Sequence, residues 1–523
     1  MTGTRTFLWL FVRRDRWLYL WFGLGSALLY VSQAWSVDGL YTTQAEFDRA
    51  AAGMESNAAL IAMAGPARAL NTTGGQVTWQ STAFGAVVIG LMTMFIIGRH
   101  TRAEEETGRD ELLRSAPVGR YAAMTAAVLD AMLASVVTGA LVSAGLIAYG
   151  LAVADSLGLG IGLALCGWFF TGTALLAAQL TASTRAAYGI AGVVIGAAYV
   201  LRAIGDVSVP ALSWLSPIGW YQAMHAFSGL RWWPALLLPV GGAIATAAAY
   251  AVFDRRDYGS GVMATRPGPT HAGWDLRGGW GLAWRLQRPA FLGWFAGLAV
   301  SGLSFGVMGD DVSDLVGDSE LSKQMMLQGQ GDIVDSFYAT LLAMLALLAC
   351  GFAVSSALRP HGEEDGGRLE TLLATALPRR TWLAGHVLVT VLGTAAVLGA
   401  SGSGLGVSFA LVTGDGGAVG EYTLGVLSYL PAVLALSGIA RLLYGVAPRL
   451  SSLSWLALLL AAVVLLFGEV LRLPQWFQDL SPFEHLAFVP AEDFRWAPFL
   501  VLASLAAVLS VAGQVAFTRR DVH

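Results

Sequence analysis

The sequence predicts an all-α integral membrane protein with twelve transmembrane helices, arranged as two six-helix halves of the same orientation. Composition, apolar runs and an internal repeat support this prediction. Of the 523 residues, 56% are hydrophobic and only 13% are charged, whereas soluble proteins carry roughly 25% charged residues. Apolar runs of about 20 residues recur along the chain, and each is long enough to cross a hydrocarbon layer of about 30 Å.

The apolar runs define the expected spans and domains. We expect a first half over residues 1–258, a cytoplasmic linker over 259–288 and a second half over 289–523. No clear cleavage site follows the first run, which we therefore interpret as a retained span and not as a signal peptide. The twelve expected spans are 17–37, 81–98, 121–152, 159–183, 186–205, 232–253, 289–309, 334–358, 382–413, 421–446, 452–472 and 497–517.

The distribution of Lys and Arg predicts the orientation in the membrane. If the N-terminus is inside, the cytoplasmic segments hold 24 of these residues and the opposite side holds 7. Cytoplasmic loops carry the excess of positive charge in membrane proteins, so both termini are predicted to be cytoplasmic. Residues 4–16 end in a basic cluster and are expected to form an interfacial helix, as is the end of the linker. The alternative for residues 4–16 is a simple extension of the first span.

A charged segment between the second and third spans occurs twice. The first copy is Glu104–Arg120, EEETGRDELLRSAPVGR, and the second is Glu363–Arg379, EEDGGRLETLLATALPR, 259 positions later. Each is expected to form a cytoplasmic helix, over 104–117 and 363–377. The residues aligned without a gap are Glu104 with Glu363, Glu105 with Glu364, Glu106 with Asp365, Gly108 with Gly367, Arg109 with Arg368, Glu111 with Glu370, Leu113 with Leu372 and Arg120 with Arg379.

In a helix, Glu105 would pair with Arg109 four residues on, and Glu364 with Arg368. A solvated loop that merely holds the topology is the alternative for such a segment. Because loops drift after duplication, two matching copies favour a surface bound by identical partners on both halves.

Other segments extend the repeat to the ends of the halves. Ser216-Pro217 recurs as Ser481-Pro482, and Phe253-x-Arg-Arg-Asp recurs at Phe517. Arg13-x-x-Arg16 likewise recurs as Arg285-x-x-Arg288. Because six spans is an even number, both halves insert the same way up, related by a pseudo-twofold axis along the membrane normal.

Ionisable residues inside spans are the other candidate functional residues, because each is costly in the hydrocarbon. Asp130 lies within the third span and either lines a transport pathway or has a structural hydrogen-bonding role. Arg202 and Glu469 lie in equivalent spans and are a candidate outer gate between the halves. The alternative is a pair of local ion pairs, Arg202 with Asp206 and Glu469 with Arg472.

Several classes of function are disfavoured. The only lysine, Lys323, stands in Ser-Lys-Gln, so the chain has no Walker A motif and no ATP site of its own. Cys166 and Cys350 lie in apolar runs and are expected to be buried and unpaired. His225, His386 and His485 have no metal-ligand spacing, and no catalytic arrangement is evident. We therefore expect no metal and no catalytic residue. The net charge of −4 gives no indication of nucleic acid.

Across its whole length the chain resembles the permeases of ABC-2-type exporters, of the actinobacterial polyketide-antibiotic or multidrug (tetronasin-exporter-like) type. The resemblance rests on the EEE-x-GR-x-E-L-L segment, its repeat, the long loop after the first span and the Ser-Pro segment before the sixth. It implies the type V-like transmembrane domain of ABC exporters. It further implies that Glu104–Leu113 and Glu363–Leu372 are coupling helices, docked on two copies of a separate subunit that binds ATP and Mg²⁺.

Two functions remain open. The first is an ATP-driven exporter subunit for lipophilic or amphipathic drugs. The second is a proton-driven twelve-helix drug antiporter. The Gly-x-x-x-Asp-Arg pattern of such antiporters is absent from the loop after the second span, and the loop over 38–80 is long for that class.

Overall fold

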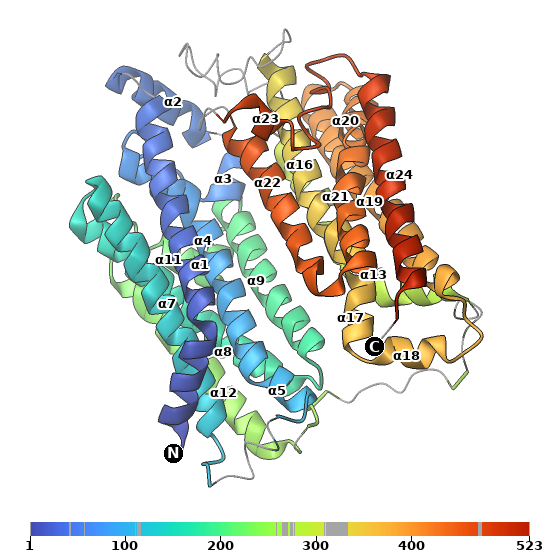
Figure 1. Ribbon diagram of the computed structural model, residues 1–523. Coiled ribbons are helices and arrows are strands. Elements are labelled where there is room, and N and C mark those ends of the chain that lie inside the picture. The colour runs from blue at the N-terminus through green and yellow to red at the C-terminus, as the bar shows by residue number, and fades with distance from the viewer. Residues whose placement is uncertain are drawn as a thin grey trace. The chain divides into compact units, whose positions relative to one another are not determined.

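The computed structural model describes residues 2–521 except 41–42, 57, 110, 112–116, 258, 264–269, 272, 274–275, 277, 308, 310–332 and 469–472. Within these residues every regular element is a helix (Figure 1). Contacts along the chain divide it into two compact units, Met1–Pro267 and Gly268–His523.

The first unit contains four long membrane-length helices between α1 and the last helix, α12. Its elements are α1 (Thr4–Leu40), α2 (Gln44–Ser56), α3 (Ala58–Ala64), α4 (Thr73–His100), α5 (Arg102–Glu106), α7 (Ala122–Tyr149), α8 (Val153–Leu180), α9 (Thr184–Val207), α10 (Pro210–Ser213), α11 (Pro217–Gln222), the 3₁₀ helix η1 (Trp233–Leu236) and α12 (Leu237–Arg255).

The second unit follows a similar order of long and short helices. Its elements are α13 (Gly279–Gly306), α16 (Ile333–Ala357), α17 (Arg359–Asp365), α18 (Arg368–Leu373), α19 (Arg379–Thr413), α20 (Ala418–Leu427), α21 (Leu430–Val446), the 3₁₀ helix η4 (Pro448–Leu453), α22 (Ser454–Phe467), α23 (Gln475–Gln478) and α24 (Trp496–Arg519).

Eleven helices among the described residues are long and apolar enough to cross a membrane. Each overlaps one of the expected spans from 81–98 to 497–517. The expected first span lies inside α1, which is not one of these eleven, so the twelfth crossing stays a prediction. α1 nevertheless exposes large apolar side chains, including Trp17, Trp21 and Trp35, as a lipid-facing helix does.

The interfacial segments differ from expectation. Residues 4–16 belong to the continuous helix α1, so the alternative of an extended first helix describes them. The end of the linker, from Gly279, likewise continues through Pro289 as part of α13. In the first unit, the uninterrupted helix satisfies the backbone hydrogen bonds that a break at the membrane surface would expose. In the second unit, Pro289 has no backbone N–H to donate, and α13 nevertheless continues through it.

The same kinds of helix pair pack together in each unit. α1 contacts α7 in the first unit and α13 contacts α19 in the second; α7 packs on α8, and α19 packs on α20. The last helix of each unit also contacts a helix from the fourth expected span of that half. α12 packs on α8, and α24 packs on α21.

Glycines permit the close approach of two of these pairs. A Cβ atom on Gly139 of α7 would lie 2.2 Å from the carbonyl oxygen of Gly160 on α8. A Cβ atom on Gly445 of α21 would lie 2.2 Å from the carbonyl oxygen of Gly513 on α24. The hydrophobic effect does not drive helices together in lipid, so close van der Waals packing supplies much of the attraction between them.

The Ser-Pro segment of the first unit forms a short helix and not an open loop. Ser216 precedes α11 and accepts hydrogen bonds from the backbone N–H groups of Ile218 and Gly219, while its hydroxyl donates to the carbonyl oxygen of Ala198 at 2.6 Å. This N-cap fixes α11 against α9. In the second unit, Ser481-Pro482 is followed by turns, and the short helix α23 (Gln475–Gln478) lies before it, at the position of α10.

Candidate functional site: two charged turns

The first charged segment turns at Gly108. α5 ends at Glu106, and the backbone N–H of Thr107 bonds to Ala103. Gly108 has φ of +69°, a conformation that costs residues with a Cβ atom about 1–2 kcal/mol. The expected helix over 104–117 is therefore interrupted here, and most of its second part, with Leu113, lies outside the described residues.

The second charged segment turns at the equivalent glycine. α17 ends at Asp365, Gly367 has φ of +67°, and α18 begins at Arg368. Two short helices thus replace the single helix expected over 363–377. Figure 1 shows α5 at the same end of the first unit as the N-terminus, and α18 at the same end of the second unit as the C-terminus.

The turns change the expected ion pairs. A continuous helix would pair Glu105 with Arg109, but the turn instead brings Arg109 towards Glu104, at 4.0 Å. In the second unit Arg368 Nε donates to Glu363 Oε2 at 2.6 Å. The expectation of pairs between Glu105 and Arg109 and between Glu364 and Arg368 is therefore wrong, because the first helix of each segment ends before the left-handed glycine that separates the partners.

The first glutamate of each segment has a second arginine partner. Arg14 of α1 lies 2.5 Å from Glu104, and Arg359 of α17 lies 2.6 Å from Glu363. The Glu363 side chain is only 2% exposed, whereas Glu104 is 12% exposed. The second unit therefore holds this carboxylate more deeply.

The second glutamate of each segment pairs with the end of the last helix of its unit. Arg256 Nη2 donates to Glu105 Oε1 at 2.5 Å, and Arg520 donates to both oxygens of Glu364 at 2.6 and 2.5 Å. The two arginines are 264 positions apart, and the two glutamates are 259 apart. Arg102 adds a contact to Glu105 at 2.6 Å and donates to the carbonyl oxygen of Ala178 on α8.

Aromatic rings support both arginines. The Arg256 guanidinium lies 5.2 Å from the ring centre of Phe253, and that of Arg520 lies 5.2 Å from Phe517. Arg520 also lies 5.1 Å from Tyr444. Cations over aromatic faces are stabilised by the ring quadrupole. Each charged turn is thus fastened to the end of the last helix by the same two types of contact.

The ion pairs of the second charged turn shift the pKa values of two arginines that lie outside the membrane-length helices. Hydrogen bonding to Glu363, together with its negative charge, raises the pKa of Arg368. For Arg520, burial acts to lower the pKa, but the hydrogen bonds and charge of Glu364 outweigh it, so the pKa is raised. Both arginines are therefore permanently cationic.

Only part of each predicted interface is exposed. Arg109, Asp365 and Arg368 have side chains that are 63%, 68% and 59% exposed. Glu111 and Glu370 are also exposed, and Leu372 is half-buried. Glu105, Glu363 and Glu364 are held inside, and Glu106 accepts hydrogen bonds from the backbone and hydroxyl of Thr184. The glutamates before each glycine are thus held within the turns, and the arginines after each glycine, Arg109 and Arg368, are exposed.

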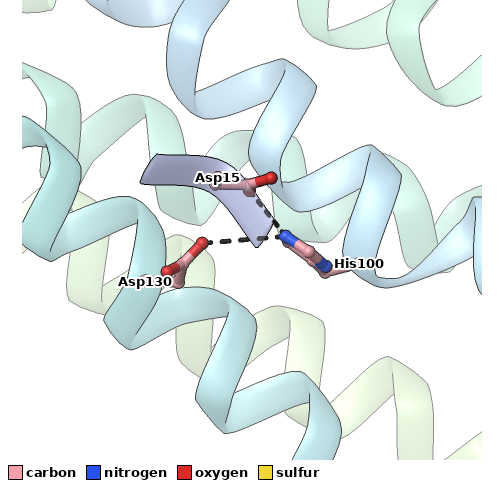
Figure 2. Close-up of side chains that lie close together, drawn as sticks. All are labelled: Asp15, His100 and Asp130. Carbon is pink, nitrogen blue, oxygen red and sulfur yellow. Dashed lines mark hydrogen bonds and ion pairs between the residues drawn. The ribbon is translucent and has the colours of Figure 1, made fainter. Parts of the chain in front are cut away.

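A second cluster brings Asp130 together with residues that sequence reasoning missed (Figure 2). His100 Nε2 lies 2.6 Å from Asp15 Oδ2 and 3.8 Å from Asp130 Oδ2, and all three side chains are fully buried. Arg99 lies 2.6 Å from Asp15 Oδ1, and the Tyr19 hydroxyl donates to Asp130 Oδ1 at 2.7 Å. The cluster thus joins α1, α4 and α7.

No spacing in the sequence could have revealed this cluster, since its members come from three helices. Asp15 and His100 stand at the charged ends of apolar runs, where they resemble ordinary interfacial residues. The side chain of Asp130 has the structural hydrogen bond that was one of its two expected roles.

The second unit has uncharged partners at the corresponding place. Aligning Arg13-x-x-Arg16 with Arg285-x-x-Arg288 places Gln287 at the position of Asp15. Gln287 Nε2 lies 2.9 Å from His386 Nδ1, and its Oε1 accepts from Ser356. Ser356 also lies 2.7 Å from Thr390.

Of the candidate gate, only Arg202 lies among the described residues. Arg202 is fully buried, 3.5 Å from Asp206, and donates to the carbonyl oxygen of Met63 at 2.9 Å. The Arg202 guanidinium lies 4.6 Å from the ring centre of Tyr199. The local pair considered for Arg202 is therefore present, while Glu469 and Arg472 lie outside the described residues. The gate stays a prediction.

The eleven helices that are long and apolar enough to cross a membrane define a multi-pass integral membrane protein. Comparison with known proteins supplies its family. Residues 276–518 match the family model described as "Multidrug efflux system permease Rv1217c, C-terminal domain". The chain is 38% identical over 527 aligned residues to the multidrug efflux system permease protein Rv1217c of Mycobacterium tuberculosis, covering 100% of this chain and 96% of that protein. The chain belongs to this family of multidrug efflux permeases.

Proposed function

We propose that this protein is the permease subunit of an ATP-binding-cassette exporter of the ABC-2, tetronasin-exporter-like type. It moves lipophilic or amphipathic drugs out of the cell. A separate ATPase subunit, present in two copies, supplies the energy from ATP and Mg²⁺. The chain itself is not an enzyme and binds no cofactor. Both termini and both charged turns face the cytoplasm, where the ATPase is found.

One observation carries the proposal: equivalent glutamates pair with equivalent arginines in both units. Glu105 with Arg256 and Glu364 with Arg520 tie each charged turn to the last helix of its unit. A force applied to the turn is therefore transmitted to a membrane helix through a short, largely buried ion pair. Two identical ATPase subunits would act on two such turns.

The exposed arginines are the proposed docking residues. Arg109 and Arg368 follow the left-handed glycines at equivalent positions, and each is more than half exposed. A guanidinium forms planar, bidentate contacts with carboxylates of a partner protein. Glu111, Asp365 and Glu370 add exposed acidic groups that would fix the register of docking.

The test is reconstitution of the chain with its ATPase in lipid vesicles, followed by drug transport and ATP hydrolysis. With R109E and R368E combined, we expect drug-stimulated hydrolysis to fall about tenfold, within the usual range of coupling free energies. R495E is the matched control, because Arg495 is 68% exposed and pairs with Glu492 away from the turns. Unchanged hydrolysis in the double variant would refute docking at the turns.

A proton-driven drug antiporter is the second candidate, and the buried Asp15–His100–Asp130 cluster favours it. In vesicles, the two mechanisms separate cleanly. Export that stops without ATP and continues when an ionophore collapses the proton gradient supports the exporter. The opposite result supports the antiporter.

A further inference from the structure

We propose that Asp130 is a proton-binding carboxyl group, held neutral inside the first unit by its surroundings with Asp15 and His100. The proton is the ligand of this site, and its release frees a negative charge between α1 and α7. The inference concerns proton binding and holds for either source of energy for transport.

The environment of Asp130 does not suit a carboxylate. Its side chain is fully buried, and Oδ1 accepts one hydrogen bond, from Tyr19. Oδ2 is buried without a hydrogen-bond partner among the described residues and points towards His100 (Figure 2). An ionised carboxylate needs several donors or a counter-ion when it is taken out of water.

Counting charges shows that one proton balances the site. Arg99 lies 2.6 Å from Asp15 and neutralises it. One carboxylate oxygen of Asp15, one of Asp130 and a ring nitrogen of His100 all lie within 4.8 Å of one another. Two carboxylates at such a distance do not both ionise readily. His100 Nδ1 is buried without a hydrogen-bond partner among the described residues, so a proton on that nitrogen would leave a buried donor unpaired. With Asp15 paired, the Asp130 carboxyl is therefore the group that carries the proton of a neutral cluster.

The same count argues against a divalent cation in this place. With Asp15, Asp130 and Arg99 ionised, the cluster carries one negative charge, and a divalent ion would leave one buried positive charge. The 2.6 Å between His100 Nε2 and Asp15 Oδ2 is a hydrogen-bond distance. The ring of His100 is in addition stacked on Phe11, with 3.9 Å between ring centres.

The site is particular to the first unit. At the corresponding place in the second unit, Gln287, Ser356 and Thr390 form a neutral network around His386. Among the described residues, the charged or titratable side chains of the cluster are Asp15 and Tyr19 on α1, Arg99 and His100 on α4 and Asp130 on α7. Arg14, the neighbour of Asp15 in the chain, pairs with Glu104.

Release of the proton has a structural consequence. The new carboxylate faces Asp15 across His100, and repulsion acts directly between α7 and α1. The single Tyr19 hydroxyl hydrogen is shared between Oδ1 and the backbone carbonyl oxygen of Asp130. Its bond to Oδ1 opposes the repulsion, because a hydrogen bond to an ionised carboxylate is stronger than one to a neutral acceptor.

Infrared difference spectroscopy of the purified full chain in nanodiscs tests the proposal. Between about pH 5 and about pH 9, a range around the ordinary pKa of His and above that of Asp, we expect a protonated-carboxyl band that disappears as pH rises. D130N should lose this band, and D130E should restore it with a shifted frequency if D130N folds poorly. D206N is the matched control, since Asp206 is buried beside Arg202 and should leave the band unchanged.

A band that is unchanged in D130N, or no titrating band in the wild type, would overturn the inference. Calorimetric titration with Zn²⁺ alone provides a second decision. Stoichiometric binding that is lost in both D130N and H100Q would assign the cluster to a metal and not to a proton.

Discussion

Arg520 donates hydrogen bonds from Nη1 and Nη2 to the two carboxylate oxygens of Glu364, at 2.6 and 2.5 Å. These residues are 156 positions apart, and they join the charged turn of the second unit to the end of its last helix. Bidentate arginine–carboxylate pairs combine strength with a fixed geometry. The pair therefore sets the position of the turn relative to α24.

Breaking this pair should destabilise the second unit. We expect E364Q to lower the free energy of unfolding by on the order of 2 kcal/mol, because Arg520 would be left partly buried without its carboxylate. Thermal unfolding in detergent measures the effect. The double variant E364R/R520E should recover part of the loss. No recovery and no loss would mean that the pair contributes nothing to the position of the turn.

Substitution of the left-handed glycines should cost conformational energy alone. A Cβ atom on Gly108 or Gly367 would meet nothing within 4 Å, so G108A and G367A should each destabilise by about 1–2 kcal/mol through φ strain. Asparagine, which tolerates this region, should be milder.

Gly362 provides the matched control for that series. It lies inside α17 and also has nothing within 4 Å of an added Cβ atom. G362A should stabilise the helix by about 0.5–1 kcal/mol. The same sign for G362A and G367A in thermal unfolding would contradict the role of the turn.

The two arginines that we propose for docking should differ in their effect on stability. Arg368 bonds at 2.6 Å to Glu363, which is 2% exposed, whereas Arg109 lies 4.0 Å from Glu104. Exposed, long ion pairs contribute about 0–1 kcal/mol. R109A should therefore leave the melting temperature nearly unchanged, and R368A should lower it measurably. Equal melting temperatures would show that Arg359 alone suffices for Glu363.

Mild acid should weaken the first unit through His225. Burial, followed by the charges of Arg68 and Arg231, lowers the pKa of His225 to about 4. Since the unfolded chain binds this proton near pH 6.5, stability is fully present above that pH and is lost as pH falls towards about 4.

H225N should flatten this part of the pH profile. His225 has φ of +55°, and asparagine accepts that backbone conformation. Thermal unfolding of both proteins between about pH 7 and about pH 4 measures the difference. A wild-type profile identical to that of H225N would exclude His225 as the titrating group.

The membrane-length helices were predictable from the apolar runs of the sequence. In lipid, an apolar segment must satisfy its own backbone hydrogen bonds, which a helix does. Eleven expected spans accordingly overlap the eleven membrane-length helices. The bounds of the charged helices were less predictable, since helical spacing around Glu105 and Glu364 was compatible with one continuous helix. In the structure, Gly108 and Gly367 adopt left-handed conformations that end the first helix of each segment. Helical spacing does not predict such a conformation, because it depends on where the packed chain must turn.

The sequence alone thus determined the helical membrane architecture, the lack of a Walker A motif and the positions of the repeated charges. Only the tertiary structure decided which charges meet. Glu105 pairs with Arg256, Glu364 pairs with Arg520, and His100 lies between Asp15 and Asp130, because packing brings together residues that are distant in the chain. Local periodicity specifies which face of a helix a residue occupies, and burial among neighbouring helices then selects its partner.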